Sequence, residues 1–197
     1  MSDVTRRDTL QILAGIPLLA AGLSPRTVVR AVESARRARE AGAGYTPVFF
    51  TAHEYQIVVI LVDIIIPRDE RSGSATDAAV PQFIDYIVWD QKDMQTPIRG
   101  GLAWLDNECR ERFGKTFLEA GDSQRLAVLD DIAWPKKARP EMSQGVAFFN
   151  EFRDLTASGF FSSRMGVEDL QYLGNTVVPE WKGCPPAALE KLGVSYE

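Results

Sequence analysis

The sequence predicts an all-α, single-domain protein, an irregular helical bundle with long loops. Apolar residues recur at helical spacing along most of the chain, and no stretch shows the strict alternation of a half-buried strand. Capping residues, prolines and glycines stand where these periodic segments begin and end. With 197 residues, of which 45% are hydrophobic, the chain is long enough for one buried core. We expect a signal segment at 1–24, a helical linker at 25–48 and a helical domain at 49–197.

A pair of arginines and a short apolar segment open the chain. Arg6 and Arg7 precede 12 uncharged residues, from Ile12 to Leu23. That length suits the core of a signal peptide and is shorter than the roughly 20 residues of a membrane-spanning helix. Together these features indicate a twin-arginine signal, which directs folded proteins across the bacterial inner membrane. We therefore expect a periplasmic protein, and retention at the inner membrane by an uncleaved signal stays open.

The linker at 25–48 has a helical composition up to Gly42 and carries a basic stretch. Arg36, Arg37 and Arg39 lie close together in a chain whose net charge is −5 and whose pI is near 5.1. We interpret this stretch as a solvated helix face or as a tether near the membrane. The acidic balance of the whole chain argues against nucleic acid as a partner.

The clearest helix start is at Thr51, which forms a capping box with Glu54. An apolar run follows as far as Ile66, and Pro67 ends it. Apart from one narrow polar stripe the run is apolar, so we expect a central helix that is packed nearly all round. Beyond it we expect a loop at 67–79, helices that begin near Val80, Thr96, Asp122 and Ser143, a helix end at Gly159, and a tail of loops and short helical turns.

The two cysteines have different surroundings in the sequence. Cys109 shares a helical stripe with Leu102 and Leu105, so it is predicted to be a small core residue. Cys184 lies between Gly183 and two prolines, in a turn predicted to be exposed. An exported chain with two cysteines can form one disulfide. Pairing of Cys184 with Cys109 and bridging of Cys184 to a partner chain both stay open.

The sequence offers little material for catalysis. Its single histidine, His53, lies in the first turn of a helix without a serine-elbow or cysteine motif, so we interpret it as a polar residue beside the cap. Zinc, phosphate-loop and covalent haem motifs are missing, and we expect no catalytic, cofactor-binding or metal-binding residue. The alternative is a free-standing periplasmic enzyme that uses His53 and Asp63 as an acid–base pair.

Large aromatic residues near the end of the chain are candidates for a protein interface. Phe160 and Phe161 follow the glycine expected to end a helix, and Trp181 lies between Pro179 and Gly183. Aromatic side chains on loops often anchor protein–protein contacts. The alternative is that they fold back and close the core, which we favour for Phe161. With Cys184, these residues form the predicted partner interface.

Several segments together resemble the gluconate 2-dehydrogenase subunit 3 family. The resemblance covers roughly 49–194, and the order of its pieces and the twin-arginine start make it specific. The pieces are FFTAHEY at 49–55, DIIIP at 63–67, SGSATDAAVPQFID at 72–85, GFFSS at 159–163, QYLGN at 171–175 and PEWKGC at 179–184.

This resemblance implies a non-catalytic small subunit. Members of the family bind a large FAD-containing catalytic subunit of the glucose-methanol-choline (GMC) oxidoreductase class, which oxidises a sugar or an alcohol. The flavin therefore belongs to the partner. The small subunit is expected to stabilise the large one and to carry it, folded, through the twin-arginine translocase. A multihaem cytochrome c subunit often completes such a complex.

Overall fold

A computed structural model describes residues 24–40, 44–172, 180 and 183–196. Within these ranges every regular element is a helix, which confirms the predicted all-α class. The elements are α3 (Pro25–Glu40), α4 (Ala52–Ile65), α5 (Val80–Asp90), α6 (Lys92–Phe113), α7 (Asp122–Ala133), the 3₁₀ turn η1 (Pro140–Met142), α8 (Ser143–Ser162), α9 (Arg164–Asp169) and α10 (Pro186–Leu192). The predicted signal residues Arg6 and Arg7 and the aromatic Trp181 lie outside the described residues.

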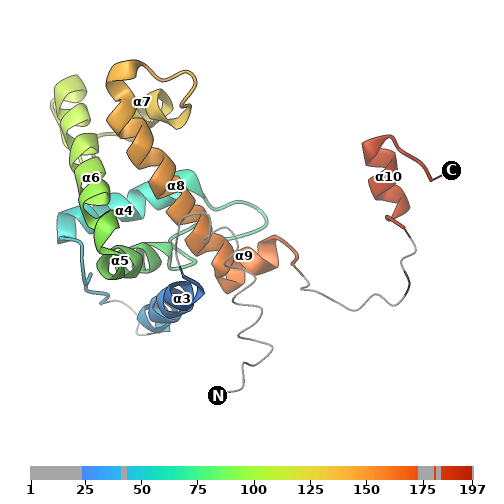
Figure 1. The fold of residues 1–197 in the computed structure, drawn as a ribbon. Helices are drawn as coiled ribbons and strands as arrows, with labels where there is room; N and C mark the ends of the chain where they lie inside the picture. Colours follow the sequence, from blue (N-terminus) through green and yellow to red (C-terminus); the bar gives the residue numbers. More distant parts are fainter. Residues whose placement is uncertain (1–23, 41–43, 173–179, 181–182, 197) are drawn as a thin grey trace.

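Helix α8 is the centre of the bundle, and α4, α5, α6, α7 and α9 all pack against it (Figure 1). The helix after Thr51 was predicted to be central, and in this respect the prediction is wrong, although no residue from Ile57 to Ile66 is exposed. Helix α4 buries Ile57, Val58 and Leu61 on one face, whereas Ile60 and Ile64 are only partly buried against the core. The apolar run of α4 is covered by α5, α6 and α8, all of which pack against it.

The start of α4 follows the sequence prediction. The Thr51 hydroxyl accepts from the Glu54 backbone N–H at 3.2 Å, and the Glu54 carboxylate accepts from the Thr51 N–H at 2.8 Å. This reciprocal capping box satisfies two N–H groups that the helix itself leaves without partners. The loop at 66–79 then leads to α5 and is ordered by its own polar contacts, among them Ser74 N–H to Asp77 Oδ2 at 2.8 Å.

The segment at 45–50 is fixed to the bundle by one buried carboxylate. Asp85 on α5 is fully buried and accepts hydrogen bonds from the backbone N–H groups of Val48, Phe49 and Phe50 at 2.7, 3.1 and 3.0 Å. The Tyr45 hydroxyl donates a fourth bond at 2.6 Å. Burial and the neighbouring Asp85 raise the pKa of Tyr45 above its ordinary value, so its hydroxyl keeps the proton that it donates.

Helix α3, predicted as part of a linker, packs against α5 (Figure 1). Val28, Ala31 and Ala35 form its contact face and are at most 5% exposed. Together with the Asp85 contacts, this packing attaches residues 24–40 and 45–50 to the helical bundle. No helix among the described residues has the length and apolar character needed to cross a membrane.

Two predicted helix boundaries were wrong, each because of a tertiary contact. Helix α6 begins at Lys92, one turn before Thr96, because Met94 extends its buried stripe. Helix α8 continues past Gly159 to Ser162. Gly159 does not cap this helix: a Cβ there would lie 2.8 Å from the Phe83 ring, so its small size permits close packing of α8 on α5.

Candidate functional site

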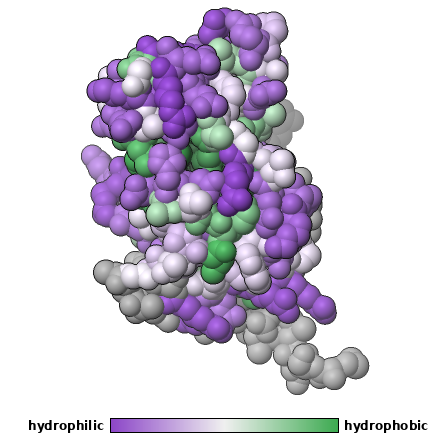
Figure 2. Space-filling view, turned by 90° about the vertical axis from the view of Figure 1, so that its left-hand side faces the viewer, coloured by the Kyte–Doolittle hydropathy of each residue, from purple (hydrophilic) through white to green (hydrophobic). Residues whose placement is uncertain are grey.

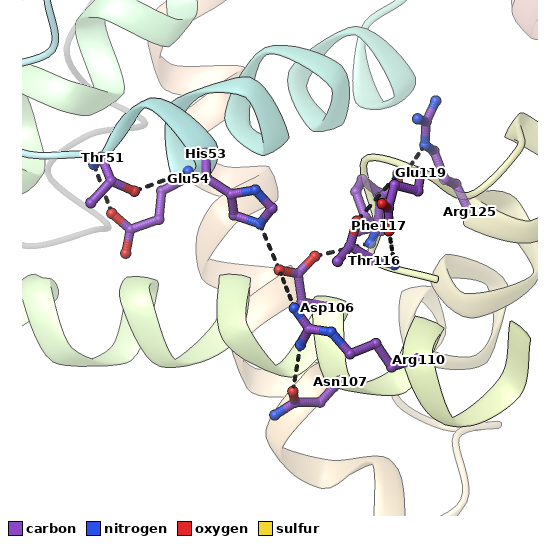
Figure 3. A network of polar contacts seen from close by, with 10 residues as sticks. All are labelled: Thr51, His53, Glu54, Asp106, Asn107, Arg110, Thr116, Phe117, Glu119 and Arg125. Atoms are coloured by element: carbon purple, nitrogen blue, oxygen red, sulfur yellow. Dashed lines mark hydrogen bonds and ion pairs between the residues drawn. The ribbon is translucent and has the colours of Figure 1, made fainter. Parts of the chain in front are cut away.

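His53 is paired with a buried carboxylate of another helix (Figure 3). Its Nε2 lies 2.6 Å from Oδ2 of Asp106 on α6. The Asp106 side chain is 8% exposed and the His53 side chain 46% exposed, so one side of the imidazole faces solvent. The contact joins the first turn of α4 to the middle of α6, and the sequence separation of 53 residues left no local signal by which it could be predicted.

Asp106 also holds the loop between α6 and α7 (Figure 3). Its Oδ1 accepts from the Phe117 backbone N–H at 2.9 Å, and Arg110 lies 3.5 Å from Oδ2. Arg125 on α7 donates to the carbonyl of Phe117 at 2.9 Å, so both backbone groups of Phe117 are hydrogen-bonded to side chains of the flanking helices. Two of the contacts of Asp106, those with His53 and Phe117, connect different parts of the fold, whereas Arg110 is one turn further along α6. We interpret the His53–Asp106 pair as a structural connection between α4, α6 and this loop.

The predicted alternative, an acid–base pair of His53 and Asp63, is wrong. The two residues are ten positions apart on α4, which separates them by about 15 Å along the helix axis. Asp63 instead accepts from the Thr76 backbone N–H at 2.8 Å and so fixes the loop before α5. Among the described residues, no group of three or more His, Cys, Asp or Glu side chains could hold a metal ion.

A mostly apolar hollow of about 310 Å³ lies between α6 and α8, away from His53. Its lining comprises Thr96, Pro97, Gly100, Gly101 and Trp104 from α6 and Gln144, Ala147, Phe148 and Glu151 from α8. Burial, and to a smaller extent the charge of Asp93, raises the pKa of Glu151. The hollow was not predicted, although the adjacent glycines Gly100 and Gly101 mark a place where another helix can approach.

The predicted interface residues differ in how far they are exposed to solvent. Phe160 is 1% exposed and belongs to α8, so the prediction of a loop anchor is wrong for this residue: it packs in the core because the helix continues through it. Phe161 is partly buried, with its ring edge-on to Phe160 at 5.2 Å. Cys184 is a partly exposed free thiol, and its N–H donates to the Tyr196 hydroxyl at 2.7 Å.

Cys109 occupies the core, as predicted, and is fully buried on α6. Burial, followed by the nearby charge of Asp106, raises the pKa of its thiol, which keeps it in the unreactive protonated form. The structure contains Cys109 and Cys184 as free thiols, without a bond between them.

Exposed apolar side chains are scattered over the surface, and sequence reasoning missed most of them. The described residues of this kind are Val48, Trp89, Leu126, Trp134, Leu170, Tyr172, Leu192, Val194 and Tyr196. Figure 2 shows one face, on which apolar residues form small separate patches within a largely hydrophilic surface. Single aromatic residues such as Trp89 and Trp134 carry no periodic signal that separates exposed from buried positions.

The sequence of the helical body matches a known protein family. A family model described as gluconate 2-dehydrogenase subunit 3 matches residues 52–179, which is more than half of the chain. The chain belongs to the gluconate 2-dehydrogenase subunit 3 family. Neither a curated protein nor a solved structure matches the chain significantly.

Membership of the gluconate 2-dehydrogenase subunit 3 family means that the chain is related to one subunit of a dehydrogenase complex. The match begins at the first turn of α4 and includes α4 to α9 with the His53–Asp106 pair. Asp85 lies within it, but the residues that donate to Asp85, from Tyr45 to Phe50, precede it. It ends before Cys184 and α10, so the C-terminal segment of the resemblance lies outside the matched residues.

Proposed function

We propose that this chain is the non-catalytic small subunit of a periplasmic FAD-dependent dehydrogenase complex that oxidises a sugar or an alcohol. In this role it stabilises the catalytic flavoprotein and directs its folded export. The family match over 52–179 is the observation that carries the proposal. The pairing of His53 with Asp106 supports it, because the only histidine of the chain is already engaged in a contact between helices.

The partner in this proposal is a large GMC-type flavoprotein, which holds the FAD and performs the oxidation. A multihaem cytochrome c subunit receives the electrons in complexes of this kind and is a second proposed partner. Folded export suits such an assembly, because a flavoprotein must bind its cofactor before it leaves the cytosol. Arg6 and Arg7 supply the signal, and the twin-arginine translocase is the proposed machinery.

The C-terminal segment is the proposed contact with the flavoprotein. No residue of α10 is buried, and a helix of seven residues is too short to be stable by itself in water. Leu192 and Tyr196 are 70% and 62% exposed, and the Tyr196 hydroxyl lies beside Cys184. Burial of these residues against a partner, together with Phe161 and Trp181, would stabilise the complex. In the oxidising periplasm, Cys184 is available for a disulfide with the partner.

Replacement of both signal arginines by lysine tests the export role. We expect Arg6→Lys with Arg7→Lys to leave this chain and the flavoprotein in the cytosol, because the translocase requires the arginine pair. The matched control is Arg36→Lys with Arg37→Lys, a second adjacent arginine pair in the same chain. Cell fractionation with a dehydrogenase assay on each fraction gives the readout. Normal periplasmic activity in the Arg6/Arg7 variant would contradict the carrier role.

A further inference from the structure

Helix α3 has two opposite faces of different character. Its buried face, Val28, Ala31 and Ala35, packs against α5. Its exposed stripe consists of Arg26, Arg30, Glu33 and Arg37, which are spaced by four, three and four residues. At 100° per residue this spacing keeps the four side chains on one line along the helix, directly opposite the buried face. The stripe therefore points away from the body of the protein.

The charge of this stripe is mostly uncompensated. Arg37 forms an ion pair with Glu33 at 3.2 Å, in which both side chains are well exposed. Arg26 and Arg30 form no ion pair with any residue in the described ranges. The stripe therefore carries a net positive charge, although the net charge of the whole chain is −5. A local cationic line on an acidic protein selects an anionic surface over a neutral one.

The surroundings of α3 favour a lipid surface over a protein as the anionic partner. None of the large apolar residues found exposed in the described part of the chain lies on α3, whereas protein interfaces are usually centred on aromatic or aliphatic side chains. The helix also follows directly after the apolar segment at 12–23. Basic residues next to an apolar segment of this kind are typical of sites that bind anionic lipid headgroups.

We propose that the arginine stripe of α3 binds anionic phospholipid headgroups and holds the helical body against the membrane. The stripe runs from Arg26 to Arg37, 11 steps of 1.5 Å or about 17 Å, which is long enough to contact several headgroups in a plane. Each arginine near an anionic surface strengthens binding by about fivefold. The contact is electrostatic, so it weakens as salt shortens the screening length. This inference does not depend on the flavoprotein partner.

Vesicle binding of the purified full chain tests the proposal. The probes are vesicles of phosphatidylcholine alone and vesicles in which about a third of the lipid is phosphatidylglycerol. The test variant is Arg26→Gln with Arg30→Gln, and the matched control is Lys136→Gln with Arg164→Gln, which removes two exposed charges elsewhere. All four positions are exposed, so circular dichroism should show an unchanged fold. Comparison of the two lipids separates the electrostatic contact from insertion of the apolar segment.

We expect the Arg26/Arg30 variant to bind the anionic vesicles about 25-fold more weakly than the unmodified chain. Binding to neutral vesicles and binding by the control variant should stay unchanged. Equal binding of the variant and the unmodified chain to anionic vesicles would overturn the proposal. It would also be overturned if the variant kept its vesicle binding but lost affinity for the purified flavoprotein, because the stripe would then be a protein interface.

Discussion

At the scale of single residues, Asp85 shows how one side chain organises a segment that has no regular structure. The carboxylate is fully buried and accepts four hydrogen bonds, three of them from consecutive backbone N–H groups. A buried charge is stable only when such bonds replace its hydration. Asp85 therefore attaches the chain before α4 to the side of α5, and the entry into the capping box at Thr51 is positioned by it.

Replacement of Asp85 by asparagine should lower the free energy of unfolding by about 3 kcal/mol, because the amide offers fewer acceptors and turns an N–H₂ toward buried donors. Urea unfolding followed by circular dichroism measures this loss. Asp154→Asn is the control, since Asp154 is exposed and forms only a surface pair with Arg153, and it should change stability by less than about 0.5 kcal/mol. Equal losses in the two variants would contradict the role assigned to Asp85.

Glu151 lies beside the hollow between α6 and α8, and its raised pKa should make the stability of the fold depend on pH. Its pKa is raised above the ordinary value of 4.5 by burial and by Asp93. The folded chain therefore holds this proton more tightly than the unfolded chain. The resulting contribution to stability is complete below pH 4.5 and is lost as pH rises through the raised value.

Glu151→Gln removes the carboxylate whose ionisation is penalised. It should raise the midpoint of thermal unfolding at about pH 7 and have little effect at about pH 4. Glu111→Gln, at an exposed position of α6, is the matched control and should show no such difference between the two pH values. A destabilised Glu151→Gln protein at neutral pH would contradict the direction assigned to this pKa.

At the scale of helices, close contact of α6 with α8 depends on missing side chains. A Cβ at Gly101 would lie 1.9 Å from the Phe148 ring, and one at Gly145 would lie 2.6 Å from the Trp104 ring. Neither contact is possible without displacement of an aromatic side chain. The two glycines therefore set the distance between the central helix α8 and its longest neighbour.

Gly101→Ala should destabilise the protein by about 2 kcal/mol, because the added methyl group overlaps with Phe148. Gly100→Ala is a control at the adjacent position, where an added Cβ has no atom within 4 Å. It should stabilise α6 by up to about 1 kcal/mol through its higher helix propensity. Chemical denaturation of both variants gives the comparison, and effects of the same sign would contradict the packing.

The boundaries of the elements show which parts of the fold can be predicted from sequence. The capping box of Thr51 and Glu54 was predictable because all its atoms lie within four residues. The continuation of α8 through Gly159 was not, because the reason for that glycine is Phe83 on another helix. The same limit applies to the site: His53 was visible as a polar residue beside a cap, but its partner Asp106 lies 53 positions away.

At the scale of the whole molecule, the chain combines a helical body with two terminal segments of different proposed use. The body, from α4 to α9, corresponds to the family match. At the N-terminal end, α3 is docked on α5 and presents its arginines outward. At the C-terminal end, no residue of α10 is buried, and the apolar side chains of Leu192, Val194 and Tyr196 are exposed. This arrangement suits a subunit that attaches to a larger protein and links it to the export route and the membrane.

In the proposed role the chain works as a subunit, and the flavin and the chemistry belong to its partner. The most direct measurement is purification of the chain from its native host, followed by an absorption spectrum and a sugar-oxidation assay with an artificial electron acceptor. We expect a larger yellow flavoprotein to copurify and activity to follow that protein, while the separated chain has none. Turnover by the separated chain, or a flavin bound to it, would contradict a non-catalytic role.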